Sequence, residues 1–171
     1  MFDTVLIAGL GLMGGSMAKT IKARTLSRVL GWNRTRATAE QALADGSIDA
    51  IATEALYKEA DLVIIGLYPQ ATVDWLLENM PKMKKGCVIV DMVGVKQFMV
   101  DHLEQAALDA GVHYVGGHPM AGREFSGLDY SLPTLFDGAS MIFVPTRSST
   151  ERVLEQLEAY FMSLGFGQTV R

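Results

Sequence analysis

The sequence predicts an α/β fold, a doubly wound and mostly parallel sheet with helices on both faces. Two observations predict it. Short apolar runs alternate with helix-forming segments along most of the chain, and a glycine-rich turn follows the first of these runs. Short connections between alternating strands and helices imply right-handed crossovers between parallel strands. The 171 residues are enough for one well-filled core, so we expect residues 1–171 to form a single domain.

The individual elements follow from composition and spacing. Strands are expected at short apolar runs, of which residues 4–8 should be buried on both faces, and helices are expected where Ala, Leu, Met and charged residues recur at helical spacing. Thr35 should cap the second helix, Pro69 should end the third strand, and Ser148 and Glu151 stand at capping-box spacing before the last helix. In order, the expected elements are strand 4–8, helix 16–24, strand 28–32, helix 35–44, strand 62–67, helix 71–79, strand 87–91, helix 97–109, strand 112–115, a long loop at 116–138, strand 140–144, helix 150–164 and strand 167–170.

The turn after the first strand has the spacing G-x-G-x-x-G and opens a helix, which is typical of a Rossmann-type dinucleotide site. The first glycine allows a tight turn, the second lets the backbone approach a pyrophosphate, and the third lets helix and strand pack closely. Free N–H groups at the helix start would then bind the phosphates. The residues of this turn are Gly9, Leu10, Gly11, Leu12, Met13 and Gly14.

The end of the second strand indicates which cofactor is preferred. NAD-binding domains usually carry a carboxylate there, whereas NADP-binding domains often place an arginine near the 2′-phosphate. This chain has Asn33, Arg34 and Thr35 at that point and no carboxylate. We therefore expect NADP to be favoured, with NAD as the alternative.

Two further strand ends should face the nicotinamide half of the cofactor, because ligands of doubly wound sheets bind at the carboxyl ends of the strands. The residues expected there are Leu67, Tyr68, Pro69, Val93 and Gly94. His118 follows another strand in a glycine-flanked stretch, where a ligand could approach, and an imidazole exchanges protons near neutral pH. His118 is thus a candidate catalytic residue, whereas we expect His102 and His113 to be structural.

Composition argues against several other classes of protein. The net charge of −4 offers no basic surface for nucleic acid, and no apolar run is long enough for a membrane span. Cys87 is the single cysteine and should be buried, so neither an intrachain disulfide nor a cysteine-based metal site is expected. The first residues do not read as a signal peptide, and we expect a cytoplasmic protein without a metal.

Four stretches resemble the prephenate and arogenate dehydrogenases of tyrosine biosynthesis. They are residues 7–16 (IAGLGLMGGS), 60–64 (ADLVI), 91–96 (DMVGVK) and, most specifically, 116–127 (GGHPMAGREFSG). The resemblance implies an oxidoreductase in which hydride leaves ring C4 of prephenate or arogenate for the nicotinamide and the ring carboxylate is lost as CO2. It also implies a helical domain that follows this one and forms a dimer. We expect that domain to be absent from this chain.

The resemblance assigns roles to individual residues. His118 matches the catalytic histidine, which would accept a hydrogen bond from the C4 hydroxyl. Substrate contacts are implied at Gly94, Lys96, His118, Arg123 and Glu124. Gly94 stands where the family pattern D-x-x-S-x-K has serine, and Arg123 stands where a small polar residue is common. Two alternatives remain open: a domain of a β-hydroxyacid dehydrogenase, and a non-catalytic module that binds NAD(P).

Overall fold

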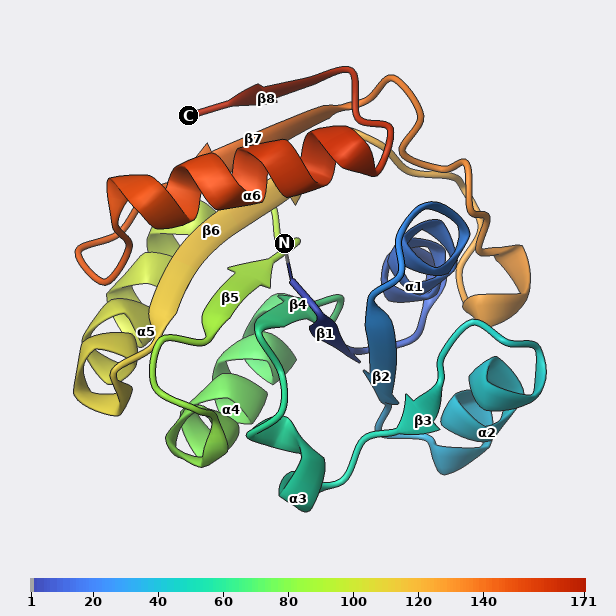
Figure 1. Ribbon diagram of the computed structural model, residues 1–171, viewed down its shortest axis with the longest axis horizontal. Helices are drawn as coiled ribbons and strands as arrows, with labels where there is room; N and C mark the ends of the chain where they lie inside the picture. The colour runs from blue at the N-terminus through green and yellow to red at the C-terminus, as the bar shows by residue number, and fades with distance from the viewer. Residues whose placement is uncertain (1) are drawn as a thin grey trace.

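The computed structural model describes residues 2–171 as one eight-stranded sheet with helices on both faces (Figure 1). The strand order is β3-β2-β1-β4-β5-β6-β7-β8, so the chain reverses direction across the sheet between β1 and β4. The strands are β1 (Thr4–Ala8), β2 (Arg28–Trp32), β3 (Ala50–Ile51), β4 (Leu62–Ile65), β5 (Val88–Asp91), β6 (His113–Pro119), β7 (Ser140–Val144) and β8 (Gln168–Val170). The helices are α1 (Leu12–Arg24), α2 (Arg36–Ala44), α3 (Glu54–Tyr57), α4 (Pro69–Asn79), α5 (Lys96–Ala110) and α6 (Glu151–Ser163), with 3-10 turns η1 (Met80–Lys82) and η2 (Leu128–Tyr130).

Strands β1 to β6 pair in parallel, β7 is antiparallel to β6, and β8 is parallel to β7. The prediction of a doubly wound, mostly parallel sheet is confirmed. In such a sheet a crevice opens at the carboxyl ends of the strands, at the point where the strand order reverses. Here that point lies between β1 and β4.

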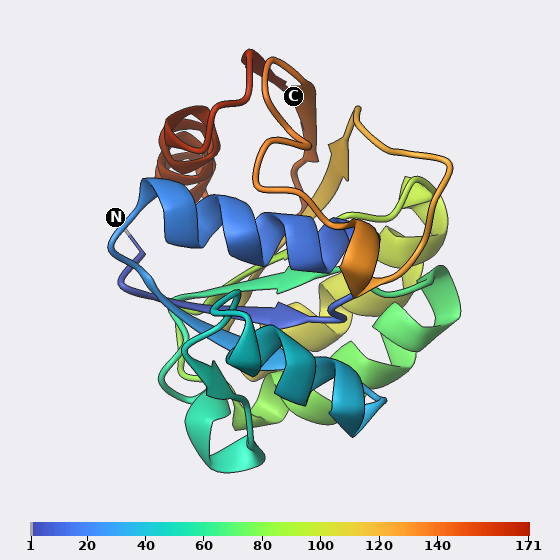
Figure 2. The same cartoon turned by 90° about the vertical axis from the view of Figure 1, so that its right-hand side faces the viewer.

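The pleat of the sheet divides the core into two clusters, because successive side chains of a strand point to opposite faces. Val5 and Ile7 of β1 belong to one cluster, with side chains of α1 and α6. Leu6 and Ala8 belong to the other, with side chains of α4 and α5. Figure 2 shows the same arrangement, with α1 and α6 on one side of the strands and α4 and α5 on the other. Residues 4–8, expected to form a strand buried on both faces, are confirmed as such, since Val5 to Ala8 are fully buried.

Several helix boundaries differ from those expected. Helix α1 begins at Leu12 rather than at residue 16, so the end of the glycine turn is already its first helical turn. Helix α4 begins at Pro69 rather than at residue 71. Proline is favourable at the first helical position, because the N–H that it lacks would have no acceptor there. Helix α6 is capped by Thr150, whose hydroxyl accepts the N–H of Val153 at 3.3 Å. The capping box predicted from Ser148 and Glu151 was wrong.

The largest difference concerns strand β6, which runs through Gly116 and His118 to Pro119. Beyond Val115 it leaves β5 and pairs with β7 instead, with His118 opposite Ile142. The loop expected at 116–138 therefore begins only after the strand ends. It is anchored on α1, where the hydroxyl of Ser16 accepts the N–H of Leu132 at 2.9 Å.

No helix within residues 2–171 combines the length and the apolar character that crossing a bilayer requires. The same residues contain no cluster of three or more His, Cys, Asp or Glu side chains that could hold a metal ion. Cys87 is fully buried, and burial raises the pKa of its thiol to about 12.

Candidate functional site

Two glycines of the turn between β1 and α1, Gly9 and Gly14, could not be replaced by another residue without movement of their neighbours. Gly9 has a φ of +93°, and a Cβ at this position would lie 2.7 Å from the carbonyl oxygen of Gly66. A Cβ on Gly14 would lie 1.7 Å from the carbonyl oxygen of Gly9, so α1 packs directly on the turn. A Cβ on Gly11 would meet nothing within 4 Å. The backbone at Gly11 thus faces open space, where a ligand can approach it.

The first turn of α1 supplies the donors of this site. Leu12 and Met13 are its first two residues, and the N–H groups of a first helical turn have no acceptor within the helix. Together with the helix dipole, they form a ready-made site for a phosphate group. Leu10 differs, because its side chain is fully buried and its N–H is already bonded.

Asn33 holds the glycine turn against the end of β2. Its Oδ1 accepts the N–H of Leu10 at 2.9 Å, and its Nδ2 donates to the carbonyl oxygen of Thr35 at 3.1 Å. The side chain therefore connects the glycine turn after β1 to the loop after β2. Asn33 does so as a neutral amide, so it brings no negative charge to the place where NAD-binding domains usually carry a carboxylate.

A cleft of about 480 Å³ opens beside this turn. Seven of the predicted cofactor residues line it: Gly9, Gly11, Asn33, Arg34, Thr35, Leu67 and Tyr68. Sequence reasoning missed the wall that α4 contributes, including Asp74, Trp75 and Glu78. Which side of an amphipathic helix borders a cleft depends on its packing, and the sequence pattern does not show it. Among residues 2–171, Arg34 forms no ion pair, whereas the neighbouring Arg36 is paired with Glu40 at 2.8 Å.

A buried network holds the carboxyl ends of β5 and β6 together. Asp91 is fully buried, and its carboxylate accepts the N–H of Val93 at 2.7 Å and the hydroxyl of Tyr114 at 2.6 Å. Lys96 donates both to this carboxylate and to the carbonyl oxygen of Gly117. Gly117 lies beyond the part of β6 that pairs with β5, and Lys96 donates to its carbonyl oxygen instead.

Burial and the charge of Asp91 shift the pKa values of Lys96 and Tyr114 in this network. Burial lowers the pKa of Lys96, and the charge of Asp91 opposes that shift. For Tyr114 both effects act in one direction, since burial and the adjacent Asp91 carboxylate raise its pKa far above its ordinary value. The hydroxyl of Tyr114 therefore stays protonated and remains a donor to Asp91 at any physiological pH.

The paired glycines before His118 make room for this network. A Cβ on Gly117 would lie 2.3 Å from the carbonyl oxygen of Asp91, and one on Gly116 would lie 3.0 Å from Cδ of Lys96. The two glycines let β6 pass close to β5 while the lysine side chain crosses it. The glycines in this stretch therefore serve a strand and not, as expected, a loop.

His118 lies on strand β6 next to Gly94, and its side chain is partly exposed. A Cβ on Gly94 would lie 3.5 Å from Cε1 of His118 and 3.8 Å from Nδ1. Nδ1 is buried and has no hydrogen-bond partner within residues 2–171. The structure thus brings His118, Gly94 and, through Gly117, Lys96 together.

Arg123 and Glu124 lie in the exposed segment after β6. The guanidinium of Arg123 donates to the carbonyl oxygen of Tyr130 at 3.0 Å and lies 5.4 Å from the ring centroid of Phe125. Within the described part of the chain, neither residue forms a hydrogen bond or an ion pair with His118. The two residues therefore stay candidates for substrate binding, without a contact that tests the assignment.

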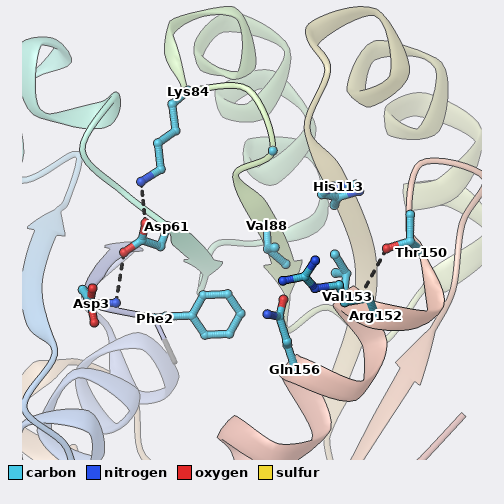
Figure 3. Close-up of a pocket in the computed structure, with 11 residues that line it drawn as sticks. Phe2, Asp3, Asp61, Lys84, Val88, His113, Thr150, Arg152, Val153 and Gln156 are labelled. Carbon is cyan, nitrogen blue, oxygen red and sulfur yellow. Dashed lines mark hydrogen bonds and ion pairs between the residues drawn. The ribbon is translucent and has the colours of Figure 1, made fainter.

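A second cavity, of about 390 Å³, lies at the opposite edge of the sheet, near the start of β1, β5 and β6 (Figure 3). Its charged side chains balance, with Lys84 and Arg152 opposed by Asp3 and Asp61. Lys84 and Asp61 already pair with each other, as the figure shows. His113 also lines this cavity, and its Nδ1 is bonded to the carbonyl oxygen of Ser148 at 2.6 Å, which fits a structural role.

Comparison with known proteins gives consistent results. The family model described as the nucleotide-binding domain of prephenate dehydrogenase matches residues 17–167. A prephenate dehydrogenase of Bacillus subtilis is 36% identical over 162 residues, which are 92% of this chain and 43% of that protein. A cyclohexadienyl dehydrogenase of Zymomonas mobilis is 28% identical over 96% of this chain and 56% of its own length. The chain thus spans about half the length of these curated relatives.

A solved structure is similar over almost the whole domain. The prephenate dehydrogenase of A. aeolicus, in complex with hydroxyphenyl propionate and NAD+, superimposes with a TM-score of 0.87 at 26% identity. The superposition covers 97% of this chain and 58% of that one. The eight-stranded sheet and its helices are therefore shared with that structure.

Proposed function

The chain belongs to the prephenate dehydrogenase family, as its nucleotide-binding domain, and from that premise we propose that it binds NADP or NAD and supplies the catalytic histidine for oxidative decarboxylation of prephenate or arogenate. One observation carries the proposal. The glycine turn after β1 and His118 near the end of β6 open at the same edge, because β1 and β6 run in the same direction within one sheet.

The residues at this edge fit a dinucleotide. The open backbone at Gly11 and the N–H groups of Leu12 and Met13 would hold the pyrophosphate, and the cleft beyond them would receive the adenosine half. Arg34, which has no ion-pair partner within residues 2–171, would bind a 2′-phosphate with two parallel hydrogen bonds. We therefore propose a preference for NADP over NAD. When bound, the cofactor accepts a hydride at its nicotinamide ring.

The imidazole of His118 would act on the substrate. As hydride leaves ring C4, His118 accepts the proton of the C4 hydroxyl, and a carbonyl forms at that carbon. Loss of the ring carboxylate as CO2 then leaves its electron pair in the ring, which becomes an aromatic phenol once the oxygen is reprotonated. Arg123 and Glu124 are proposed at the mouth of the substrate site. A dimer is proposed only together with the helical domain that the resemblance implies.

Lys96 receives a different role from the one expected. Its ammonium is engaged by Asp91 and the carbonyl of Gly117, so we propose that it holds β6 in place and does not bind substrate directly. Gly94 has no side chain to offer a substrate. Its proposed contribution is the space beside His118.

Cofactor titration of the chain tests this proposal. We expect a lower Kd for NADP than for NAD, and we expect R34A to weaken NADP by about tenfold or more, since hydrogen bonds to charged groups contribute about 1.5–3 kcal/mol. R36A is the matched control, because Arg36 is an exposed neighbour already paired with Glu40. Tighter binding of NAD would remove the NADP preference. Absence of binding by either nucleotide would remove the proposed function.

A further inference from the structure

His118, a base in the function proposed above, can carry the proton of its neutral ring on either nitrogen. Nδ1 is buried and lacks a partner among the described residues, and a Cβ on Gly94 would lie 3.8 Å from it. A neutral imidazole has one N–H donor and one acceptor nitrogen. The environment of Nδ1 therefore decides what the other nitrogen presents to the cleft.

The surroundings of Nδ1 disfavour a proton on it. A buried N–H without an acceptor is rare in folded proteins, because the group loses its hydrogen bond to water and gains none in return. An unpaired acceptor nitrogen is tolerated better than an unpaired N–H at such a place. The proton of the neutral ring is then carried by Nε2, which becomes a donor. A base needs the opposite arrangement, with the proton on Nδ1 and the lone pair on Nε2.

We infer that Gly94 holds neutral His118 largely in the tautomer protonated at Nε2, and that the group at position 94 sets the fraction of His118 able to accept a proton. Gly94 acts here through His118, as a positioning residue. Its backbone lies outside the left-handed region, so a side chain at this position brings no backbone strain. A Cβ there would make only ordinary contact with the ring.

A pair of variants isolates the effect of a hydroxyl at this place. G94A fills the position with a methyl group, and G94S adds an oxygen that can accept the N–H of Nδ1. Because Gly94 is exposed, the added hydroxyl can donate its own proton to water. The two variants differ by one oxygen atom, so a comparison of their tautomer ratios removes any effect of the Cβ itself.

The tautomer is measured on the chain without cofactor or substrate, by long-range nitrogen–proton NMR with the His118 signals identified through H118N. We expect the ratio of the Nδ1–H to the Nε2–H form to be about fivefold higher in G94S than in G94A, as one hydrogen bond contributes about 1 kcal/mol. The rate at which diethylpyrocarbonate modifies His118 should rise with this ratio. The reagent attacks an unprotonated ring nitrogen, and because Nδ1 is buried, only Nε2 can react.

Two results would overturn the inference: a wild-type His118 that already carries its proton on Nδ1, or equal tautomer ratios in G94S and G94A. Melting temperatures of both variants establish that they fold. Because neither readout needs NAD(P) or prephenate, failure of this inference is distinct from failure of the proposed function, which would appear only in the cofactor titration.

Discussion

Two turns at the same edge of the sheet are held in different ways. The turn after β1 is fixed by close backbone contacts at Gly9 and Gly14 and by the neutral amide of Asn33. The turn after β5 is fixed by the buried carboxylate of Asp91 and the ammonium of Lys96, whose exposed side-chain fractions are 0% and 16%. The first turn leaves its N–H groups free for a ligand, whereas the second consumes its polar groups internally.

This difference fits the two roles proposed above for these turns. A turn that binds phosphates must keep donors unpaired, so it depends on shape. A turn that aims a catalytic side chain must be rigid, and a satisfied buried network provides that rigidity. Removing one partner of the network should therefore cost more stability than changing the shape of the glycine turn.

The largest effect is expected from K96M. Loss of the ammonium leaves Asp91 charged and buried without its partner, which costs about 3–5 kcal/mol of unfolding free energy. Chemical denaturation measures this loss. The double variant D91N/K96M is the control, because the buried charge is then removed as well, and it should be more stable than the sum of the two single changes predicts. A K96M protein as stable as wild type would contradict the contrast between the two turns.

A smaller loss of stability is expected from G14A. Its Cβ would overlap the carbonyl oxygen of Gly9, so α1 must shift, at a cost of about 1–3 kcal/mol. G11A is the matched variant, because its Cβ meets only open space in the protein and would meet the pyrophosphate only when cofactor binds. We expect both variants to lose cofactor affinity in a titration and only G14A to lose stability. Equal melting temperatures of the two variants would show that Gly14 is not required for packing.

The two turns also differ in how far the sequence predicted them. Glycines at fixed spacing state a steric requirement locally, and the turn after β1 was recognised for that reason. The bonds from Lys96 to Gly117 and from Tyr114 to Asp91 join residues 21 and 23 positions apart, and local spacing does not reveal such contacts. The resemblance to the family predicts a substrate contact for Lys96, but the sequence does not show its bonds within the fold.

The errors in element boundaries have related causes. Gly116 and Gly117 have low strand propensity, so β6 was expected to end before them, although pairing with β7 continues it. Poor helix propensity of Gly14 and Gly15 likewise hid the first turn of α1. The short elements β3 and α3, of two and four residues, were missed because no periodicity can be recognised over such lengths. Tertiary contacts decided each of these cases.

A change of cofactor preference is expected from N33D. The carboxylate keeps the acceptor for the N–H of Leu10, so the glycine turn stays in place, whereas the bond from Nδ2 to the carbonyl oxygen of Thr35 is lost. Its negative charge repels a 2′-phosphate and accepts a hydrogen bond from a ribose 2′-hydroxyl. We expect the ratio of the Kd values for NADP and NAD to rise by about tenfold, or about 1.4 kcal/mol. An unchanged ratio in a parallel titration would mean that position 33 does not contact the 2′ group.

The smallest effect is expected from an ion pair of the same chemistry in an exposed place. Asp61 and Lys84 pair at the opposite edge of the sheet, with 31% and 41% of their side chains exposed. Burial raises the pKa of Asp61, but the hydrogen bond and charge of Lys84 and the N–H groups of Asp3 and Thr4 outweigh it, so the pKa lies below its ordinary value of 3.8. A carboxyl group whose pKa is lowered by folding stabilises the folded state at pH values above its ordinary pKa. The contribution is lost as the pH falls through the folded pKa.

Solvent screening limits this contribution to less than about 1 kcal/mol. The difference in unfolding free energy between wild type and D61N should therefore decline as the pH is lowered from 5 toward 2. Between pH 6 and 8 this difference should stay constant. Denaturation midpoints at several pH values measure it, and 0.5 M salt should reduce the difference further. If D61N cost as much stability at pH 7 as K96M, burial would not be what separates the Asp91–Lys96 pair from the Asp61–Lys84 pair. The explanation of the rigid second turn would then have to rest on its hydrogen bonds to Tyr114 and Val93 alone.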